Sequence, residues 1–82
     1  MFTVYVLKSK IVQKSYVGVT DDMVRRLKEH NYGKHFYTRR YVPWEIIHTE
    51  NFNNFRDARA REVFLKTTGG RRFLKKLFDS LN

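Results

Sequence analysis

Arg26 and His30 are two residues of this chain that could do chemistry. They lie one turn apart on a predicted helix and flank one edge of its apolar stripe. Both can therefore stand at the rim of the core and extend their side chains toward a common site. The guanidinium of Arg26 suits a phosphate that gains charge during a reaction, because it stays charged and offers a planar set of donors. A solvated surface arginine, and a histidine hydrogen-bonded to water or backbone, are the ordinary alternatives.

Glu62 is a carboxylate on the apolar face of a second predicted helix, between Phe55, Ala58 and Leu65. A buried charge is costly unless it is compensated, so Glu62 requires a partner. A neighbouring arginine is one candidate. A divalent metal is the other, since Mg²⁺ commonly takes one or two protein carboxylates and fills its other positions with water and phosphate oxygens.

Tyr5 and Tyr16 lie on predicted strands, where a tyrosine usually packs with its hydroxyl reaching water. A catalytic interpretation asks one phenol to take a proton from an attacking water, which is demanding for a group with an ordinary pKa of about 10. Arg26, a charged His30 and a bound metal would all favour the phenolate. Tyr5, Tyr16 and His30 are therefore all candidates for the proton acceptor.

Three strands are expected to position part of this set. Residues 2–7 and 16–20 are rich in Val and Tyr and alternate by two, which predicts an antiparallel hairpin. Pro43 lacks an amide hydrogen and suits the first position of a strand, and the apolar run of residues 44–49 follows it.

Three helices are also expected, over residues 22–30, from a cap at Asn53 or Asn54 to about Lys66, and over residues 71–81. Met23, Val24 and Leu27 should form the core-facing stripe of the first helix, which Gly33 should end. Residues 67–70 contain two threonines and two glycines and should interrupt the chain between the second and third helices.

Composition narrows the class of protein. We expect the 82 residues to form a single domain over residues 1–82. The absence of cysteine excludes disulfides and thiolate metal sites, and the absence of a long apolar run predicts a soluble, cytoplasmic protein that does not enter a membrane. The net charge of +9 favours a polyanionic partner. Basic residues are densest in residues 56–82. They can form the solvated face of a helix, or they can bind phosphates along that face.

The motifs with the most specific spacing run over nearly the whole chain. They are Tyr5, Tyr16-Val17-Gly18, Arg25-Arg26-Leu27-Lys28-Glu29-His30-Asn31, Tyr37-Thr38, Pro43-Trp44-Glu45 and Arg61-Glu62. This set resembles the GIY-YIG endonuclease family, and in particular its stand-alone bacterial members, which are similar to the nuclease domain of excinuclease C. The resemblance implies an α+β fold with a small three-stranded antiparallel sheet flanked by about three helices.

The resemblance also implies a role for each candidate residue. Tyr5 and Tyr16 would be the motif tyrosines, Arg26 the catalytic arginine, and His30 the histidine or tyrosine that follows one turn later. Glu62 would be the metal-binding glutamate.

Two departures from the family pattern stand out. Thr3-Val4-Tyr5 replaces Gly-Ile-Tyr, and the asparagine that many active members carry after the metal glutamate has no counterpart except Asn82. Active members often take DNA specificity from an attached domain, for which 82 residues leave no room, so the expected substrate is a DNA structure rather than a sequence.

The leading hypothesis is an enzyme, a Mg²⁺- or Mn²⁺-dependent endonuclease that hydrolyses phosphodiester bonds, with DNA as its partner. Tyr5 or Tyr16 would help to activate water, Glu62 would hold the metal, and Arg26 with His30 would stabilise the phosphate. Further nucleic-acid contacts are expected from a set of basic and aromatic side chains: Arg25, Lys28, Lys34, Tyr37, Arg39, Arg40, Arg71 and Arg72.

Two alternatives belong to other classes. In the first, the domain is a catalytically silent nucleic-acid-binding module in which the basic surface, with Tyr37, Tyr41 and Trp44, contacts phosphates and bases. In the second, it is a protein-interaction domain whose charge is incidental.

Overall fold

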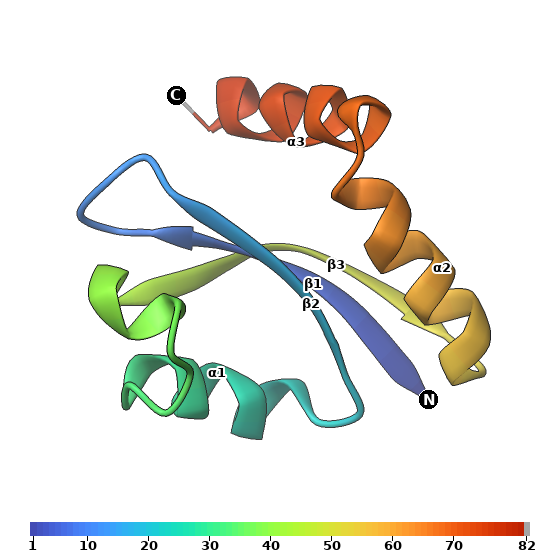
Figure 1. Cartoon of the computed structure of the whole chain (residues 1–82), viewed down its shortest axis with the longest axis horizontal. Coiled ribbons are helices and arrows are strands. Elements are labelled where there is room, and N and C mark those ends of the chain that lie inside the picture. Colours follow the sequence, from blue (N-terminus) through green and yellow to red (C-terminus); the bar gives the residue numbers. More distant parts are fainter. Residues whose placement is uncertain (82) are drawn as a thin grey trace.

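The computed structural model describes residues 1–81, so Asn82 lies outside the described residues. These residues form three strands, three α-helices and one short 3-10 helix (Figure 1). In chain order the elements are β1 (Phe2–Ser9), β2 (Ser15–Thr20), α1 (Met23–Asn31), η1 (Thr38–Tyr41), β3 (Trp44–Phe52), α2 (Phe55–Leu65) and α3 (Thr68–Ser80). No helix within residues 1–81 is both long enough and apolar enough to cross a bilayer.

β1 is the central strand of an antiparallel sheet with the order β2-β1-β3. The expected hairpin is confirmed, and it places Tyr5 directly opposite Gly18. β1 and β3 are both longer than expected, because backbone pairing continues to Ser9 of β1, opposite Trp44, and to Phe52 of β3, opposite Phe2. With its three helices, the sheet confirms the expected α+β fold.

The sheet has a small hydrophobic core on each side, with α1 and η1 on one side and α2 and α3 on the other (Figure 1). Alternate residues of β1 point to opposite sides. Val4 and Val6 pack against α2 and α3, whereas Tyr5 and Leu7 pack with Trp44 beside α1 and η1. The catalytic candidate Tyr5 thus belongs to a core of its own, separate from the core under α2.

α1 begins and ends where local signals predict. The carboxylate of Asp22 caps the helix by accepting a hydrogen bond from the backbone N–H of Arg25 at 3.1 Å. Gly33 has a φ of 81°, and its N–H donates to the carbonyl of His30 at 3.1 Å. This left-handed conformation favours glycine, so Gly33 ends the helix as expected.

α3 begins before the expected range of 71–81, and the expected interruption over residues 67–70 is wrong for the two glycines. The side chain of Thr67 caps the helix by accepting a hydrogen bond from the N–H of Gly70 at 3.3 Å. A Cβ on Gly70 would collide with the backbone of Leu65. The glycine pair therefore lets the two helices approach each other closely.

Two apolar residues expected in the core are exposed. Val24 is 69% exposed because α1 turns His30 toward the sheet in its place, and His30 is fully buried rather than at the rim. Phe55 is 50% exposed and packs edge to face on Phe2, with ring centroids 5.6 Å apart. The cap of α2 is Asn54.

An ion pair ties α2 to β3. Arg61 donates two hydrogen bonds to the carboxylate of Glu50, at 2.8 and 3.0 Å. The second oxygen of that carboxylate also lies 2.8 Å from Nε2 of His48. Arg61, one of the motif residues, therefore holds the helix that carries Glu62 against the sheet.

Candidate active site

The phenol of Tyr5 is fully buried and lies across the outer strand of the sheet. Its ring crosses Gly18, the residue opposite on β2, and a Cβ on Gly18 would collide with the Tyr5 hydroxyl. The glycine of the Tyr16-Val17-Gly18 motif therefore makes room for Tyr5 to reach toward the free edge of β2.

A chain of hydrogen bonds runs from Arg26 through Tyr5 and His30 to Thr38. Nε of Arg26 donates to the Tyr5 hydroxyl at 3.2 Å. The hydroxyl lies 2.9 Å from Nε2 of His30. In the tautomer that accepts the phenol proton at Nε2, Nδ1 of His30 carries the ring proton and faces Oγ1 of Thr38 at 2.7 Å. The structure thus brings together three predicted site residues from β1 and α1 and adds a fourth from η1.

Burial sets the protonation states in this chain of hydrogen bonds. It raises the pKa of Tyr5 to about 12, although the hydrogen bond and the charge of Arg26 oppose the increase. Burial, with the charges of Arg26 and His35, lowers the pKa of His30 to about 4. At neutral pH the shared proton stays on Tyr5 and His30 is neutral. A charged His30 that favours the phenolate, as considered from the sequence, is therefore wrong for this structure.

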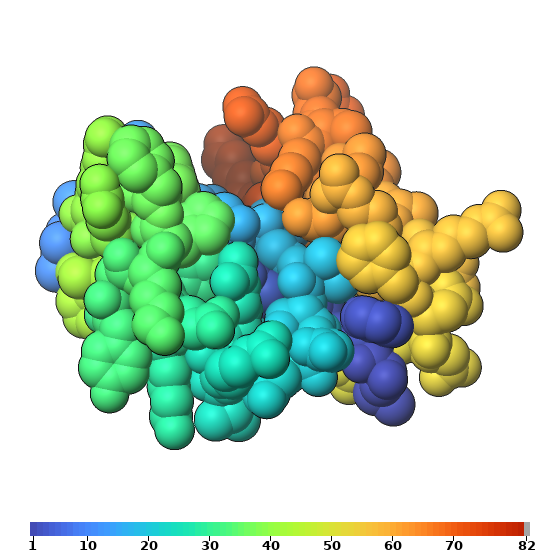
Figure 2. All heavy atoms as spheres, turned by 60° about the horizontal axis from the view of Figure 1, so that its bottom comes forward, coloured from blue at the N-terminus to red at the C-terminus, as the bar shows by residue number. Residues whose placement is uncertain are grey.

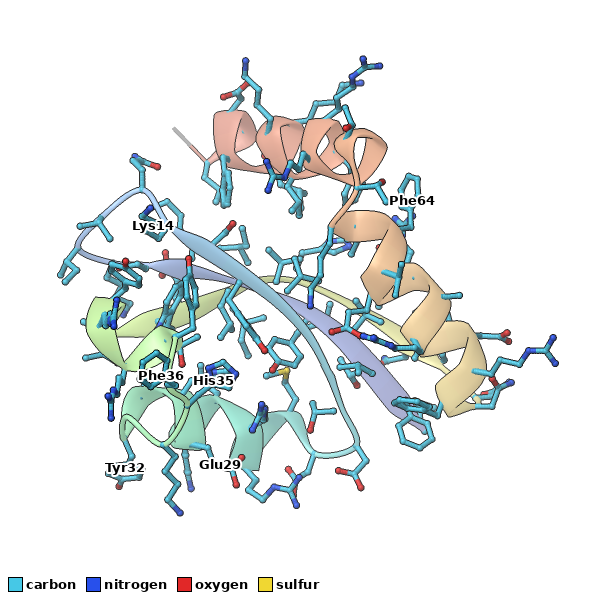
Figure 3. All side chains as sticks on the ribbon, in the orientation of Figure 1. Lys14, Glu29, Tyr32, His35, Phe36 and Phe64 are labelled. Atoms are coloured by element: carbon cyan, nitrogen blue, oxygen red, sulfur yellow. The ribbon has the colours of Figure 1, made fainter. Side chains whose placement is uncertain are left out.

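Tyr16 pairs with a second histidine, His35, which the sequence analysis did not select. The Tyr16 hydroxyl lies 3.2 Å from Nε2 of His35, and the ring centroids of Tyr16 and Tyr5 are 6.2 Å apart. His35 follows α1 and is directed toward the strands (Figure 3). Burial, with the charges of Arg26 and Lys66, lowers the pKa of His35. The two tyrosines thus form one cluster with two histidines.

Glu62 approaches this cluster from α2. It is only 6% exposed, and its carboxylate accepts hydrogen bonds from Arg59 and, at 3.1 Å, from Nζ of Lys66. Burial acts to raise the pKa of Glu62, but the hydrogen bonds from Arg59 and Lys66 outweigh it and the pKa is lowered. The arginine partner considered from the sequence is therefore present, together with a lysine.

Lys66 links Glu62 to the tyrosines. Its Nζ lies 5.9 Å from the centroid of the Tyr16 ring, and the charge of Glu62 adds to the effect of burial in raising the pKa of Tyr5. Residues 1–81 contain no group of three or more His, Cys, Asp or Glu side chains placed to hold a metal ion. A single carboxylate suffices for an ion that takes its other ligands from water and phosphate, so Glu62 fits such an ion once Lys66 turns away.

A groove of about 690 Å³ adjoins Tyr16. Of the predicted nucleic-acid-binding residues, Tyr37 and Arg71 line it. The others are exposed elsewhere on the surface: Arg25, Lys28, Lys34, Arg39, Arg40 and Arg72. Arg26 lines a smaller cavity of about 240 Å³, so the catalytic candidates lie between two hollows.

Trp44 is not available to contact bases, contrary to its role in the silent binding module. It is 2% exposed, and its Nε1 donates to the carbonyl of Thr38 at 2.7 Å. Tyr41 is half-buried, whereas Tyr37 is 41% exposed. Trp44 instead fixes η1, and through Thr38 it supports the position of His30.

This geometry coincides with a match to a known protein family. The model of the GIY-YIG catalytic domain matches residues 1–76. The chain belongs to the GIY-YIG family.

The chain is also similar to several bacterial proteins. The UPF0213 protein CPE1444 of Clostridium perfringens is 39% identical over 64 residues, which cover 77% of this chain and 68% of that protein. The UPF0213 protein SAG0778 of Streptococcus agalactiae is 40% identical over 52 residues, which cover 62% of this chain and only 59% of that protein. The solution NMR structure of the UPF0213 protein BH0048 from Bacillus halodurans has a TM-score of 0.55 and 32% identity, covering 94% of this chain and 85% of that one.

Sequence reasoning missed three residues of this candidate site. Lys66 follows Glu62 by four positions, a spacing that places two helical side chains together and could have been used. Thr38 belongs to the Tyr37-Thr38 motif, but its distance from His30 along the sequence does not predict their contact. His35 lies in a segment without periodicity, and no local signal distinguishes it.

Proposed function

We propose that the protein is a metal-dependent endonuclease that hydrolyses phosphodiester bonds of DNA and selects its substrate by structure. The observation that carries the proposal is the hydrogen-bonded chain of Arg26, Tyr5 and His30 beside the buried carboxylate of Glu62. Hydrolysis of a phosphodiester needs a positioned donor for the phosphate, a proton acceptor for water and compensation of the negative charge. The match of residues 1–76 to the GIY-YIG catalytic domain supports the same chemistry.

Arg26 binds the scissile phosphate in this proposal. Its Nη1 donates to Glu29 at 3.1 Å and its Nε donates to Tyr5, which fixes the plane of the guanidinium and leaves other N–H donors for an anion. Its side chain is 30% exposed, so an incoming phosphate can reach it. Donors held in place before the reaction stabilise developing charge without reorganising.

One of the two phenols accepts the proton from water. The charge of Arg26 favours the phenolate of Tyr5, but His30 is a weak base for the phenol proton because its pKa is lowered to about 4. Tyr16 is less deeply buried and lines the large groove, so water and substrate can approach it directly. Tyr5→Phe and Tyr16→Phe separate these routes, because only loss of the proton acceptor abolishes the rise of the cleavage rate with pH.

Glu62 would hold the metal ion, Mg²⁺ or Mn²⁺. Such an ion offsets charge on the phosphate and lowers the pKa of a nearby water or phenol. Lys66 must leave the carboxylate when the ion binds, and a phosphate beside Tyr16 offers its ammonium a new partner.

The test is cleavage of end-labelled branched, nicked, single-stranded and duplex DNA with and without Mg²⁺ or Mn²⁺. We expect metal-dependent cleavage that falls by about 100-fold or more in Glu62→Ala and Arg26→Ala. Glu45→Ala and Lys76→Ala, which change exposed residues away from the tyrosine cluster, should cleave like the parent. A Glu62→Ala protein that cuts at the parent rate would exclude this mechanism.

A catalytically silent nucleic-acid-binding module is the second candidate. The observation that favours it is the engagement of both Glu62 oxygens by cations. It predicts salt-sensitive binding that needs no divalent ion, and no turnover on any of these substrates.

A further inference from the structure

The large groove runs from Tyr16 toward α3. Residues 13–17 of the hairpin form one wall, α3 forms the other, and Tyr37 lies beside Tyr16 with ring centroids 6.1 Å apart. In Figure 2 the surface is hollowed between the green residues near η1 and the orange residues of α2 and α3, with blue atoms of β2 between them. The groove therefore leads directly away from the cluster of candidate catalytic residues.

The charged side chains that line the groove are all cationic. Lys14, Lys66, Arg71 and Lys75 line it, and none of its lining residues is acidic. Of these four, only Lys66 forms an ion pair within residues 1–81, with Glu62. Lys14 stands at the hairpin end of β2 (Figure 3). A concave surface with charge of one sign concentrates its potential and attracts a polyanion.

Aromatic rings alternate with these cations. Tyr16, Tyr37 and Phe78 line the groove, and Tyr37 is 41% exposed. Cations that contact phosphates, combined with rings on which bases stack, are the usual means of holding a single strand. The volume of about 690 Å³ lies in the range of pockets that enclose one drug-sized molecule, so the groove has room for a short stretch of one strand and is too small to enclose a duplex.

We propose that this groove binds a single-stranded segment of nucleic acid that continues from the scissile phosphate at Tyr16 toward α3. The place of the scissile phosphate rests on the proposed nuclease function, whereas binding in the groove requires no cleavage. The substrate would then carry a single-stranded arm, which explains how a small domain selects a DNA structure.

The helices α2 and α3 supply a matched pair of variants. Arg71→Ala/Lys75→Ala removes two cations from the groove, whereas Arg56→Ala/Lys76→Ala removes the same charge from exposed helical positions outside it. The probe is a fluorescein-labelled oligothymidine of about ten nucleotides, within the range of single-strand site sizes. Fluorescence anisotropy in EDTA measures binding without cleavage. The same measurement is repeated with an oligouridine and with a DNA duplex of the same length.

We expect the groove variant to bind oligothymidine about tenfold more weakly, with a salt slope smaller by roughly 1.4, the value for two lost single-strand phosphate contacts. The matched variant should stay within about threefold of the parent, and duplex binding should differ little between the two variants. Tyr37→Leu changes no charge and should also lose about tenfold through lost stacking. Circular dichroism verifies that each variant is folded.

Equal losses in the two double variants, or an equal loss of duplex binding in the groove variant, would overturn the proposal. Oligouridine binding that is tighter but equally sensitive to the groove variant would keep the groove and assign it to RNA. If the parent protein cleaves DNA but the two double variants bind oligothymidine equally well, the proposed binding groove is wrong and the proposed nuclease stands. If the groove variant alone loses binding and the parent protein cleaves no substrate, the proposed nuclease is wrong and the binding groove stands.

Discussion

His30 is a fully buried side chain with two polar ring nitrogens, and both are satisfied, one by Tyr5 and the other by Thr38. Such a residue tolerates burial only in its neutral form, which explains the depressed pKa. Protonation would put two N–H donors on the ring and would break the direction of hydrogen bonding from Tyr5. The acid sensitivity of the fold should therefore begin at this residue.

The pH dependence of stability follows from the two pKa values of His30. In the native state its pKa is lowered to about 4 by burial, with the charges of Arg26 and His35, whereas an unfolded histidine has a pKa of about 6.5. Between these values the unfolded state binds a proton that the native state does not, so stability falls as pH falls from about 6.5 toward 4. The total loss from His30 is about 3 kcal/mol, and His35, with its lowered pKa, adds an effect of the same sign.

Urea unfolding at several pH values across this interval measures the effect. The lowered pKa values of Glu50 and Glu62 reduce stability below about pH 5, so the part of the interval above pH 5 reports on the histidines. His30→Gln should flatten the dependence. Stability that is unchanged between about pH 6.5 and 5 would show that the ring is protonated in the folded protein.

At the scale of elements, the pairing of β1 with β2 decides where the site can form. Gly18→Ala places a Cβ against the Tyr5 hydroxyl, so we expect a loss of about 1–3 kcal/mol in stability and the loss of cleavage activity. Gly69→Ala is the control. Its Cβ would meet Phe64 at ordinary contact distance in an exposed first helical turn, and it should stabilise the protein by about 0.5 kcal/mol.

Urea unfolding and the cleavage assay measure both glycine variants. If Gly18→Ala were as stable and active as the parent, the phenol of Tyr5 would not depend on the space over β2.

Glu62 of α2 and Lys66 at its C-cap lie four residues apart and form an ion pair, so in the proposed mechanism the ammonium would compete with a metal ion for this carboxylate. Lys66→Met should strengthen Mn²⁺ binding about tenfold in the absence of nucleic acid, because it removes one positive charge at contact distance. Lys76→Met, on the exposed face of α3, should leave Mn²⁺ affinity unchanged. Titration followed by electron paramagnetic resonance of free Mn²⁺ gives the affinities. Weaker Mn²⁺ binding in Lys66→Met would mean that the lysine does not occupy the metal position.

The elements that could be predicted from the sequence are those fixed by local chemistry. The caps at Asp22 and Asn54 and the stop at Gly33 depend on side chains within one turn, and the motif spacing located the catalytic candidates. The early start of α3 depends on the close approach of Gly70 to the backbone of Leu65. Such a contact cannot be predicted from the local sequence pattern. The same limit explains why His35 was missed, because its partner Tyr16 comes from a different element.

At the scale of the whole molecule, two small cores share the central strand β1. Leu7→Ala opens the core beside α1, and Leu65→Ala opens the core beneath α2 and α3. Each should cost about 2–5 kcal/mol, and each should shift a single cooperative transition, because neither core can persist without β1.

Two probes report on the two sides during urea unfolding. Fluorescence of Trp44 follows the core of Leu7, and far-ultraviolet circular dichroism follows all three helices. The two curves should coincide in each variant. A Leu65→Ala protein whose Trp44 transition stayed in place while the helical signal moved would show that the halves unfold separately.

The close contact of Gly70 with Leu65 has a mechanical consequence. It joins α2 and α3 through the two residues of the turn and a backbone contact that leaves no space for a side chain, so the two helices should behave as one rigid pair. Glu62 lies on the first helix of this pair, and the Arg71 wall of the groove belongs to the second. A side chain at position 70 would have to push the helices apart, so Gly70→Ala should shift the groove wall relative to the carboxylate of Glu62.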